Sequence, residues 1–156
     1  MPENDALDAL LDIQPQAPWL ESALPELSQI PLQRWQGEHT RLFLTGYPKT
    51  SCPPYESAYR QGVMGGTAAG ELVELYRHAG LQATDIPADY LGTMLECAAY
   101  LMERGMDDLL RELTDEHLRL WVPRFARDLQ DAAELRFYRE LGKQIESLLP
   151  EPVDRV

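Results

Sequence analysis

The chain has 156 residues with 14 Lys and Arg against 26 Asp and Glu, a formal net charge of -12 at pH 7. This acidity excludes a nucleic-acid-binding face, which needs concentrated basic side chains. An acidic surface indicates either simple solubility or a basic partner. The sequence predicts a cytoplasmic protein. Its two cysteines are far apart, it shows no secretory signal pattern, and it has no apolar run near the roughly 18 residues that a membrane span needs.

Apolar residues recur at helical spacing along most of the chain. In chain order this spacing predicts helical segments at residues 6–13, 19–31, 32–46, 67–80, 90–105, 106–121 and 123–149. Pro25 is expected to interrupt the second segment and Pro123 to bend or restart the chain, so that 123–149 forms one helix or two. Gly46 and Gly80 are expected helix stops, and Thr67 is a candidate N-cap.

No stretch alternates convincingly as a strand, and no internal repeat is present. The expected fold is therefore all-α: a single globular bundle of about six or seven helices with an ordered loop near 47–66. Residues 1–156 are predicted to form one domain with a frayed tail at 150–156. Within the loop, the segment 55–66 is expected to begin a short helix that fails at its glycines.

The sequence is poor in catalytic and cofactor motifs. It has no phosphate-binding loop, and no strand precedes or lysine follows the glycines of 65–71. Glu74 and His78 share a helix face, but a surface pair is the more economical interpretation than a metal site. Cys97 is expected to act as a small hydrophobe and His117 to pack on Trp121. We therefore predict no catalytic residue, metal site or cofactor.

Four motifs follow one another in order. "EHTRLF" at 38–43 is followed by Gly46; "PPYESAY" at 53–59 joins two prolines to two tyrosines; "GLQATDIPADYL" at 80–91 is a proline-bounded turn before a helix; and "WVPRF" at 121–125 precedes "FY" at 137–138. Together they resemble the TorD/DmsD/NarJ family of cytoplasmic chaperones that mature molybdenum-containing redox enzymes. The resemblance covers residues 38–149. Two departures are a tyrosine, Tyr90, in place of the family's histidine and a shortened N-terminal part.

The resemblance implies an all-helical chaperone that is not an enzyme. It implies binding of the basic N-terminal leader, often with twin arginines, or of the apo form of the catalytic subunit of a molybdopterin oxidoreductase. Such a chaperone assists cofactor insertion and assembly before export or membrane attachment. The expected partner is that subunit alone, with no nucleic acid and no membrane insertion, and the chaperone is expected to be a monomer or a dimer.

The residues themselves permit such a site. A basic, apolar leader needs carboxylates for its guanidinium groups and an aromatic or aliphatic groove for the rest. The two proline-rich segments supply both, and we predict that they meet in one groove. The predicted peptide-binding residues are Tyr55, Glu56, Ser57, Tyr59, Asp85, Asp89 and Tyr90.

Simpler structural roles remain open for several of these residues. Asp85 or Thr84 could cap the following helix, with Pro87 in its first turn, and capping and ligand contact could coexist at Asp89. Glu38 could anchor a buried polar contact or face solvent. Core packing is expected for the motif residues Leu42, Phe43, Trp121, Phe125, Phe137 and Tyr138.

Two other functions compete with the chaperone. A helical adaptor or subunit would dock stably on a folded redox enzyme without reading a leader, and would co-purify with a catalytic subunit. A nucleotide-dependent enzyme is disfavoured by the missing phosphate loop.

Overall fold

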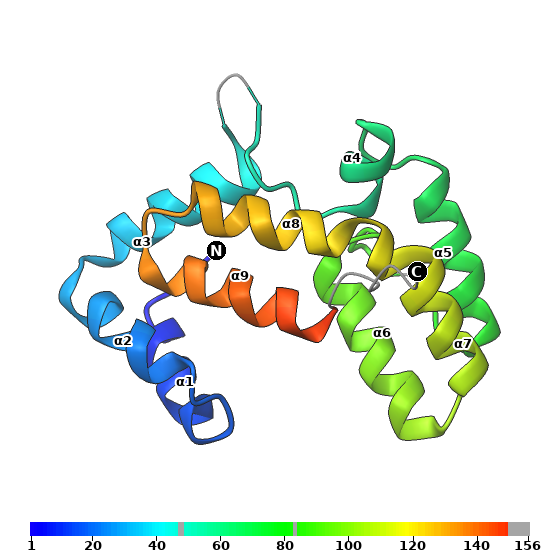
Figure 1. Cartoon of the computed structure of the whole chain (residues 1–156), viewed down its shortest axis with the longest axis horizontal. Coiled ribbons are helices and arrows are strands. Elements are labelled where there is room, and N and C mark those ends of the chain that lie inside the picture. Colours follow the sequence, from blue (N-terminus) through cyan, green and yellow to red (C-terminus); the bar gives the residue numbers. More distant parts are fainter. Residues whose placement is uncertain (47–48, 83, 150–156) are drawn as a thin grey trace, which may run out of the picture. The chain divides into compact units, whose positions relative to one another are not determined.

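The computed structural model describes residues 1–46, 49–82 and 84–149, and in these ranges all regular structure is helical apart from one isolated bridge. The all-α prediction is confirmed, while the predicted tail at 150–156 lies outside the described residues. The α-helices are α1 (Ala6–Ile13), α2 (Leu20–Gln29), α3 (Leu32–His39), α4 (Glu56–Gln61), α5 (Thr67–His78), α6 (Leu91–Arg104), α7 (Asp107–Glu112), α8 (Arg119–Ala132) and α9 (Arg136–Leu148) (Figure 1). None of these helices is long and apolar enough to cross a membrane.

Contacts divide the chain into two compact units. Unit 1 comprises Met1–Pro53 and Arg124–Leu148, and unit 2 comprises Pro54–Pro123 with the residues from Leu149 on. The chain passes from one unit to the other at Pro53–Pro54 and again at Pro123–Arg124, inside α8. That the two units form one domain, as expected from the sequence, stays a prediction.

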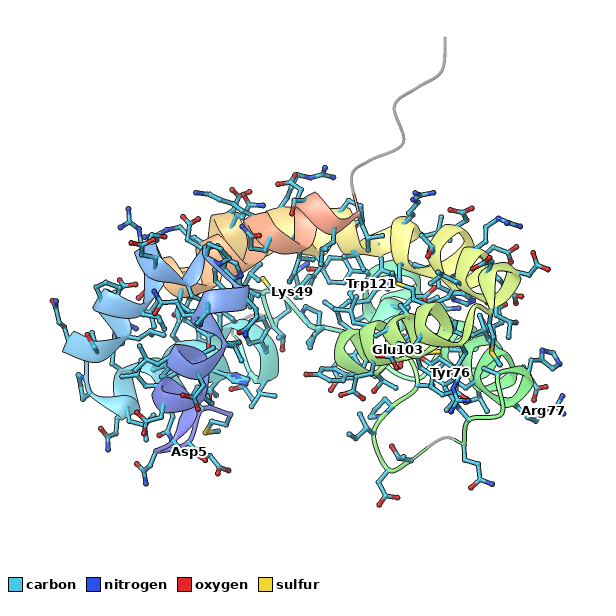
Figure 2. All side chains as sticks on the ribbon, turned by 90° about the horizontal axis from the view of Figure 1, so that it is seen from below. Asp5, Lys49, Tyr76, Arg77, Glu103 and Trp121 are labelled. Atoms are coloured by element: carbon cyan, nitrogen blue, oxygen red, sulfur yellow. The ribbon has the colours of Figure 1, made fainter. Side chains whose placement is uncertain are left out.

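Unit 1 packs α1, α2, α3 and α9 with the second half of α8. Asp5, which precedes α1, points to the outside of this unit (Figure 2). The predicted segment 32–46 is helical, but after His39 it widens into a π-helix at Thr40–Leu44. Inside, the indole N–H of Trp35 donates to the Tyr138 hydroxyl over 3.0 Å, and its ring meets Phe137 edge-on. Of the motif residues predicted to form the core, only Phe43 is half-buried and the others are buried.

Two prolines that were predicted to interrupt helices lie inside them. Pro25 sits within α2 and Pro123 within α8. A helical proline removes one N–H bond to the carbonyl four residues earlier. Those earlier residues are Glu21 and Arg119, and both are exposed, so each helix loses its bond on a side that faces solvent. The predicted segment 123–149 is nevertheless two helices, because α8 ends at Ala132 and α9 starts at Arg136.

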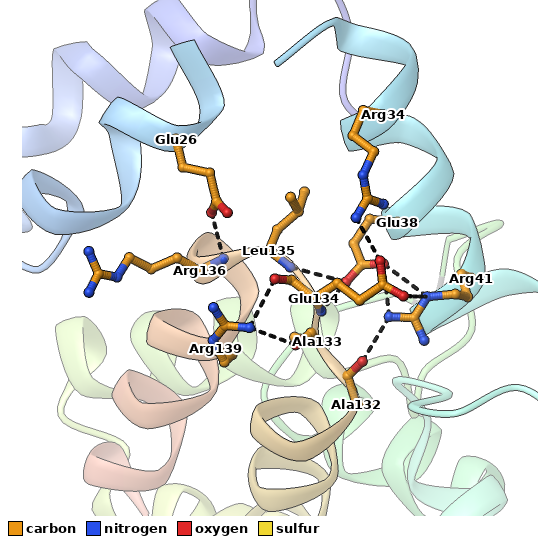
Figure 3. Close-up of polar contacts among 10 residues, drawn as sticks. All are labelled: Glu26, Arg34, Glu38, Arg41, Ala132, Ala133, Glu134, Leu135, Arg136 and Arg139. Carbon is orange, nitrogen blue, oxygen red and sulfur yellow. Dashed lines mark hydrogen bonds and ion pairs between the residues drawn. The ribbon is translucent and has the colours of Figure 1, made fainter. Parts of the chain in front are cut away.

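The connection between α8 and α9 is held by carboxylates from other helices (Figure 3). Glu38 of α3 is buried, and its Oε1 accepts the backbone N–H of Glu134 over 2.6 Å and that of Leu135 over 3.4 Å. Glu26 of α2 accepts the N–H of Arg136 over 2.6 Å. These N–H groups lie just before α9 and at its first residue and have no acceptor within the helix, so the two glutamates act as caps supplied from elsewhere in the chain. Of the two roles left open for Glu38, the structure selects the buried anchor.

Unit 2 is built from α4 to α7, a π-helix at Leu113–Leu118 and the start of α8. The predicted stop at Gly80 is confirmed: Gly80 has a positive φ of 79°, and Leu81 N–H reaches back to Tyr76 O over 2.8 Å, which closes a Schellman motif. Thr67 is the first residue of α5 rather than its N-cap, which is Gly66. Figure 2 shows Tyr76 among the packed side chains of this unit and Arg77 at its outer edge.

Both cysteines are buried and free. Burial raises the pKa of the Cys52 thiol to about 12 and that of Cys97 to about 11. Because the thiolate is the nucleophile, we expect an aromatic disulfide reagent to label neither thiol of the folded protein at pH 8 within minutes, and both thiols once guanidinium chloride has unfolded it. Absorbance of the released thiolate measures this. Rapid labelling of the native protein would contradict the burial of these side chains.

Candidate peptide-binding site

The two proline-rich segments predicted to form one groove lie side by side in unit 2. Tyr55 and Tyr90 form an isolated antiparallel bridge. On either side of it, Glu56 N–H donates to Asp89 O over 3.1 Å and Leu91 N–H donates to Pro54 O over 3.0 Å. Pro54 can join this pairing because it contributes only its carbonyl. Backbone bonds therefore fix the relative position of the two segments.

Asp89 is a buried cap for the start of α4. Its Oδ2 accepts the backbone N–H of Ser57 over 3.0 Å and also the Ser57 hydroxyl, while Ser57 Oγ accepts the N–H of Gly65 over 3.1 Å. Helix α4 has no side-chain cap of its own at Tyr55. One carboxylate thus fastens the helix start and, through Ser57, the 62–66 turn. Among the described residues, Asp89 Oδ1 has no hydrogen-bond partner.

Glu56 is also buried, and its charge is compensated. Arg60, one turn later, forms an ion pair with it, and His117 Nδ1 lies 3.0 Å from Oε2. The His117 ring nitrogen thus faces Glu56, and the Tyr59 ring lies next to Trp121 with centroids 5.6 Å apart, so the predicted packing of His117 on Trp121 stays a prediction. A carboxylate paired in this way inside the protein is not available to a ligand unless these pairs break.

Of the predicted peptide-binding residues, the three tyrosines are half-buried and reach the surface. Tyr55, Tyr59 and Tyr90 are each partly exposed, and the rings of Tyr55 and Tyr90 lie 5.7 Å apart with a 47° tilt. Partial burial raises the pKa of the Tyr55 hydroxyl, and the neighbouring Tyr90 and Asp89 add to the effect. Both rings offer flat apolar faces with polar tips.

Asp85 lies in solvent, outside any helix. Helix α6 begins at Leu91 with Tyr90 as its N-cap, so the prediction that Asp85 or Thr84 caps it, with Pro87 in its first turn, is wrong. Tyr90 has the extended backbone (φ -70°, ψ 131°) that pairing with Tyr55 requires, and the helix can start only after it. Thr84 Oγ1 instead accepts the N–H of Ile86 over 3.3 Å within the turn. Asp85 is the one predicted carboxylate that remains exposed.

Three apolar side chains beside this site were not predicted. Val63 and Met64, each 57% exposed, lie in the turn that Ser57 holds, and Ile86, 54% exposed, lies in the turn before Asp89. The sequence held a signal for them, because turns that contain glycine or proline are ordinarily polar and an apolar residue in such a turn is unusual. The four-residue spacing of Glu56 and Arg60 was a local signal for their ion pair, whereas no local signal pointed to His117 as a partner of Glu56. We group the two paired tyrosines with these side chains of the adjoining turns as one candidate surface, and call Tyr55, Tyr90, Val63, Met64 and Ile86 the tyrosine face.

Within the described part of the chain, no three His, Cys, Asp or Glu side chains gather in a way that could hold a metal ion. Glu74, considered with His78 as a metal pair, instead binds Arg77 through an ion pair of 2.7 Å. Arg77 also holds the pKa of the Glu74 carboxyl below its ordinary value.

Comparison with known proteins shows which family this chain belongs to. Residues 8–127 match the family model described as nitrate reductase delta subunit. The chain is 34% identical over 116 residues to the Tat proofreading chaperone DmsD of Salmonella typhi, covering 71% of this chain and 54% of that protein. It is 33% identical over 93 residues to the chaperone protein YcdY of Escherichia coli (strain K12), covering 58% and 48%. The chain thus spans about half the length of the curated relatives it matches.

A solved structure is similar over nearly the whole chain. It is a crystal structure of a candidate redox enzyme maturation protein from Archaeoglobus fulgidus, with a TM-score of 0.71 and 25% sequence identity. The match covers 96% of this chain and 86% of that one.

Proposed function

From the premise that this chain belongs to the nitrate reductase delta subunit family, as its motifs indicated, we propose that it is a cytoplasmic maturation chaperone for a redox enzyme. Its client is the catalytic subunit of a molybdopterin oxidoreductase. The chaperone binds the leader peptide or apo form of this subunit and assists cofactor insertion before export or membrane attachment. The relatives named as chaperones support this role, and so does the pairing of the two proline-rich segments around Tyr55 and Tyr90.

The tyrosine face suits the two parts of such a leader. Guanidinium groups stack on tyrosine rings and gain from nearby negative charge, which Asp85 and the net charge of -12 supply. Val63, Met64 and Ile86 offer apolar contact to the hydrophobic part. In this proposal Glu56, Ser57 and Asp89 position the tyrosines instead of touching the peptide, because all three are buried and already paired.

Alanine at Tyr55 or Tyr90 is expected to weaken binding of a synthetic twin-arginine leader peptide about tenfold, by removing one aromatic contact of roughly 1–2 kcal/mol. Isothermal titration calorimetry at low salt measures the dissociation constant. The matched control is Tyr100→Ala, a partly exposed tyrosine of the same unit whose ring contacts Arg104 on α6. That variant should bind like the parent protein.

Three results would count against this proposal. They are no binding of the leader by the parent protein, unchanged binding by the Tyr55 and Tyr90 variants, and equally weakened binding by Tyr100→Ala. If the protein ignores the isolated leader but co-purifies with a folded catalytic subunit, the adaptor role replaces the chaperone role.

A further inference from the structure

Helix α1 presents apolar side chains that the rest of unit 1 does not cover. It packs on α2, yet none of its eight residues is buried, and Leu11 and Ile13 are 48% and 50% exposed. An isolated helix this short is marginal in water, so α1 depends on what packs against it. The side-chain amide of Gln36 also ties its start by donating to Pro2 O over 2.8 Å.

A groove of about 330 Å³ runs between α1 and α2. Leu7 and Leu11 line it from α1, and Leu24 and Pro25 line it from α2. Glu21 stands at its edge and supplies one of the few polar groups of the lining. An apolar floor between two helices is the geometry into which a third helix can lay a row of side chains.

The two helices that form this groove, and the residues before them, carry side chains of one sign of charge. The first 33 residues include six carboxylates and no Lys or Arg, namely Glu3, Asp5, Asp8, Asp12, Glu21 and Glu26. Arg34, the first basic side chain in the sequence, is held 2.6 Å from Glu134. Glu26 caps α9, whereas Asp8 and Asp12 on α1 and Glu21 on α2 are exposed, and Glu21 lines the groove. We call these three carboxylates of the two helices the acidic rim.

We propose that the α1–α2 groove binds a basic amphipathic helix of a protein partner. Apolar side chains of that helix, spaced three and four residues apart, fill the groove, and its Lys or Arg side chains meet the carboxylates of the rim. A second copy of this chain fits poorly, because it would bring two acidic rims together without cations between them. Nucleic acid and anionic membrane surfaces are repelled for the same reason. This surface lies on unit 1, whereas the tyrosine face belongs to unit 2.

The probe is a synthetic peptide of leucine and lysine, with leucines at i, i+3, i+4 and i+7 over 18 residues. Two peptides serve as controls: one of the same composition in an order that forms no apolar face, and one with glutamate in place of lysine. Backbone amide spectra of the full chain are recorded during titration. We expect shifts centred on α1 and α2, slower hydrogen exchange in α1, and at least tenfold weaker binding of both controls.

Variants of the chain separate the groove from general acidity. Leu11→Glu is expected to raise the dissociation constant at least tenfold, whereas Leu148→Glu, at a 67% exposed leucine of α9 in the same unit, should change it less than twofold. Asp12→Lys should weaken binding about fivefold, and Glu103→Lys, an exposed carboxylate of unit 2, less than twofold. Asp12→Lys keeps the test valid if Leu11→Glu unfolds α1.

Several outcomes overturn the inference. The glutamate peptide could bind as well as the lysine peptide, or both control variants could weaken binding as much as the groove variants. Shifts centred on Tyr55 and Tyr90 would assign the probe to the tyrosine face. A dimer in sedimentation that Leu11→Glu abolishes would make a second copy of the chain the occupant.

Discussion

Replacing Glu38 with alanine is expected to lower the free energy of unfolding by about 3 kcal/mol, because the substitution leaves buried donors without their acceptor. The carboxylate is 1% exposed and accepts the N–H groups of Glu134 and Leu135. Its other oxygen accepts from Arg41 Nε over 2.9 Å, and Arg41 in turn donates to Ala132 O over 2.7 Å (Figure 3). One substitution therefore loosens the end of α8 and the start of α9 together.

Urea unfolding followed by circular dichroism measures this loss, and two variants calibrate it. Glu38→Gln keeps an oxygen for the two N–H groups but loses the charge that faces Arg41, so about half of the loss is expected. Glu134→Ala removes a carboxylate that contacts Arg34 at the surface, and its effect should be far smaller because water screens that pair. Equal losses for Glu38→Ala and Glu134→Ala would show that Glu38 is not an anchor.

Asp89→Ala is expected to destabilise the protein by about 2–3 kcal/mol, through loss of the cap of α4 and of the link to the 62–66 turn. The Ser57 N–H and hydroxyl both lose their acceptor in a buried place. Ser57→Ala removes the hydroxyl and leaves the N–H contact, so a loss of about 1 kcal/mol is expected. Urea unfolding gives these values, and faster amide exchange at Ser57 and Gly65 identifies the place affected.

The same variants separate positioning from direct contact with a leader peptide. If Asp89 positions Tyr55 and Tyr90, Asp89→Ala weakens leader binding only together with faster exchange around Ser57 and Gly65. The Asp89→Asn variant, which keeps an oxygen for the Ser57 donors but removes the charge, tests the alternative of direct contact. Lost leader binding with unchanged stability and unchanged exchange in this variant would mean that the carboxylate contacts the arginines itself.

The positions of most helices followed from local patterns. Apolar residues at steps of three and four predicted the helical segments. Gly80 ended α5 as expected, because a left-handed residue after the last turn is a local requirement that glycine meets without strain. The order of the four motifs indicated the family for a similar reason, since spacing along the chain is itself the signal. The prediction that Pro25 and Pro123 break their helices was wrong, because packing decides whether the residue four positions earlier faces solvent.

The roles of the buried carboxylates could not be obtained in that way. Glu38, Glu56 and Asp89 find their partners 96, 61 and 32 residues away, at Glu134, His117 and Ser57. Helical spacing predicts which side chains share a face, but an acid on that face stays in water or becomes buried according to the donors that the folded chain brings to it. Amino-acid order therefore identified Asp89 and the tyrosines as one place on the molecule. Three-dimensional packing assigned the acid to the interior and the rings to the surface, because desolvation of a carboxylate is tolerated only where donors from distant segments converge on it.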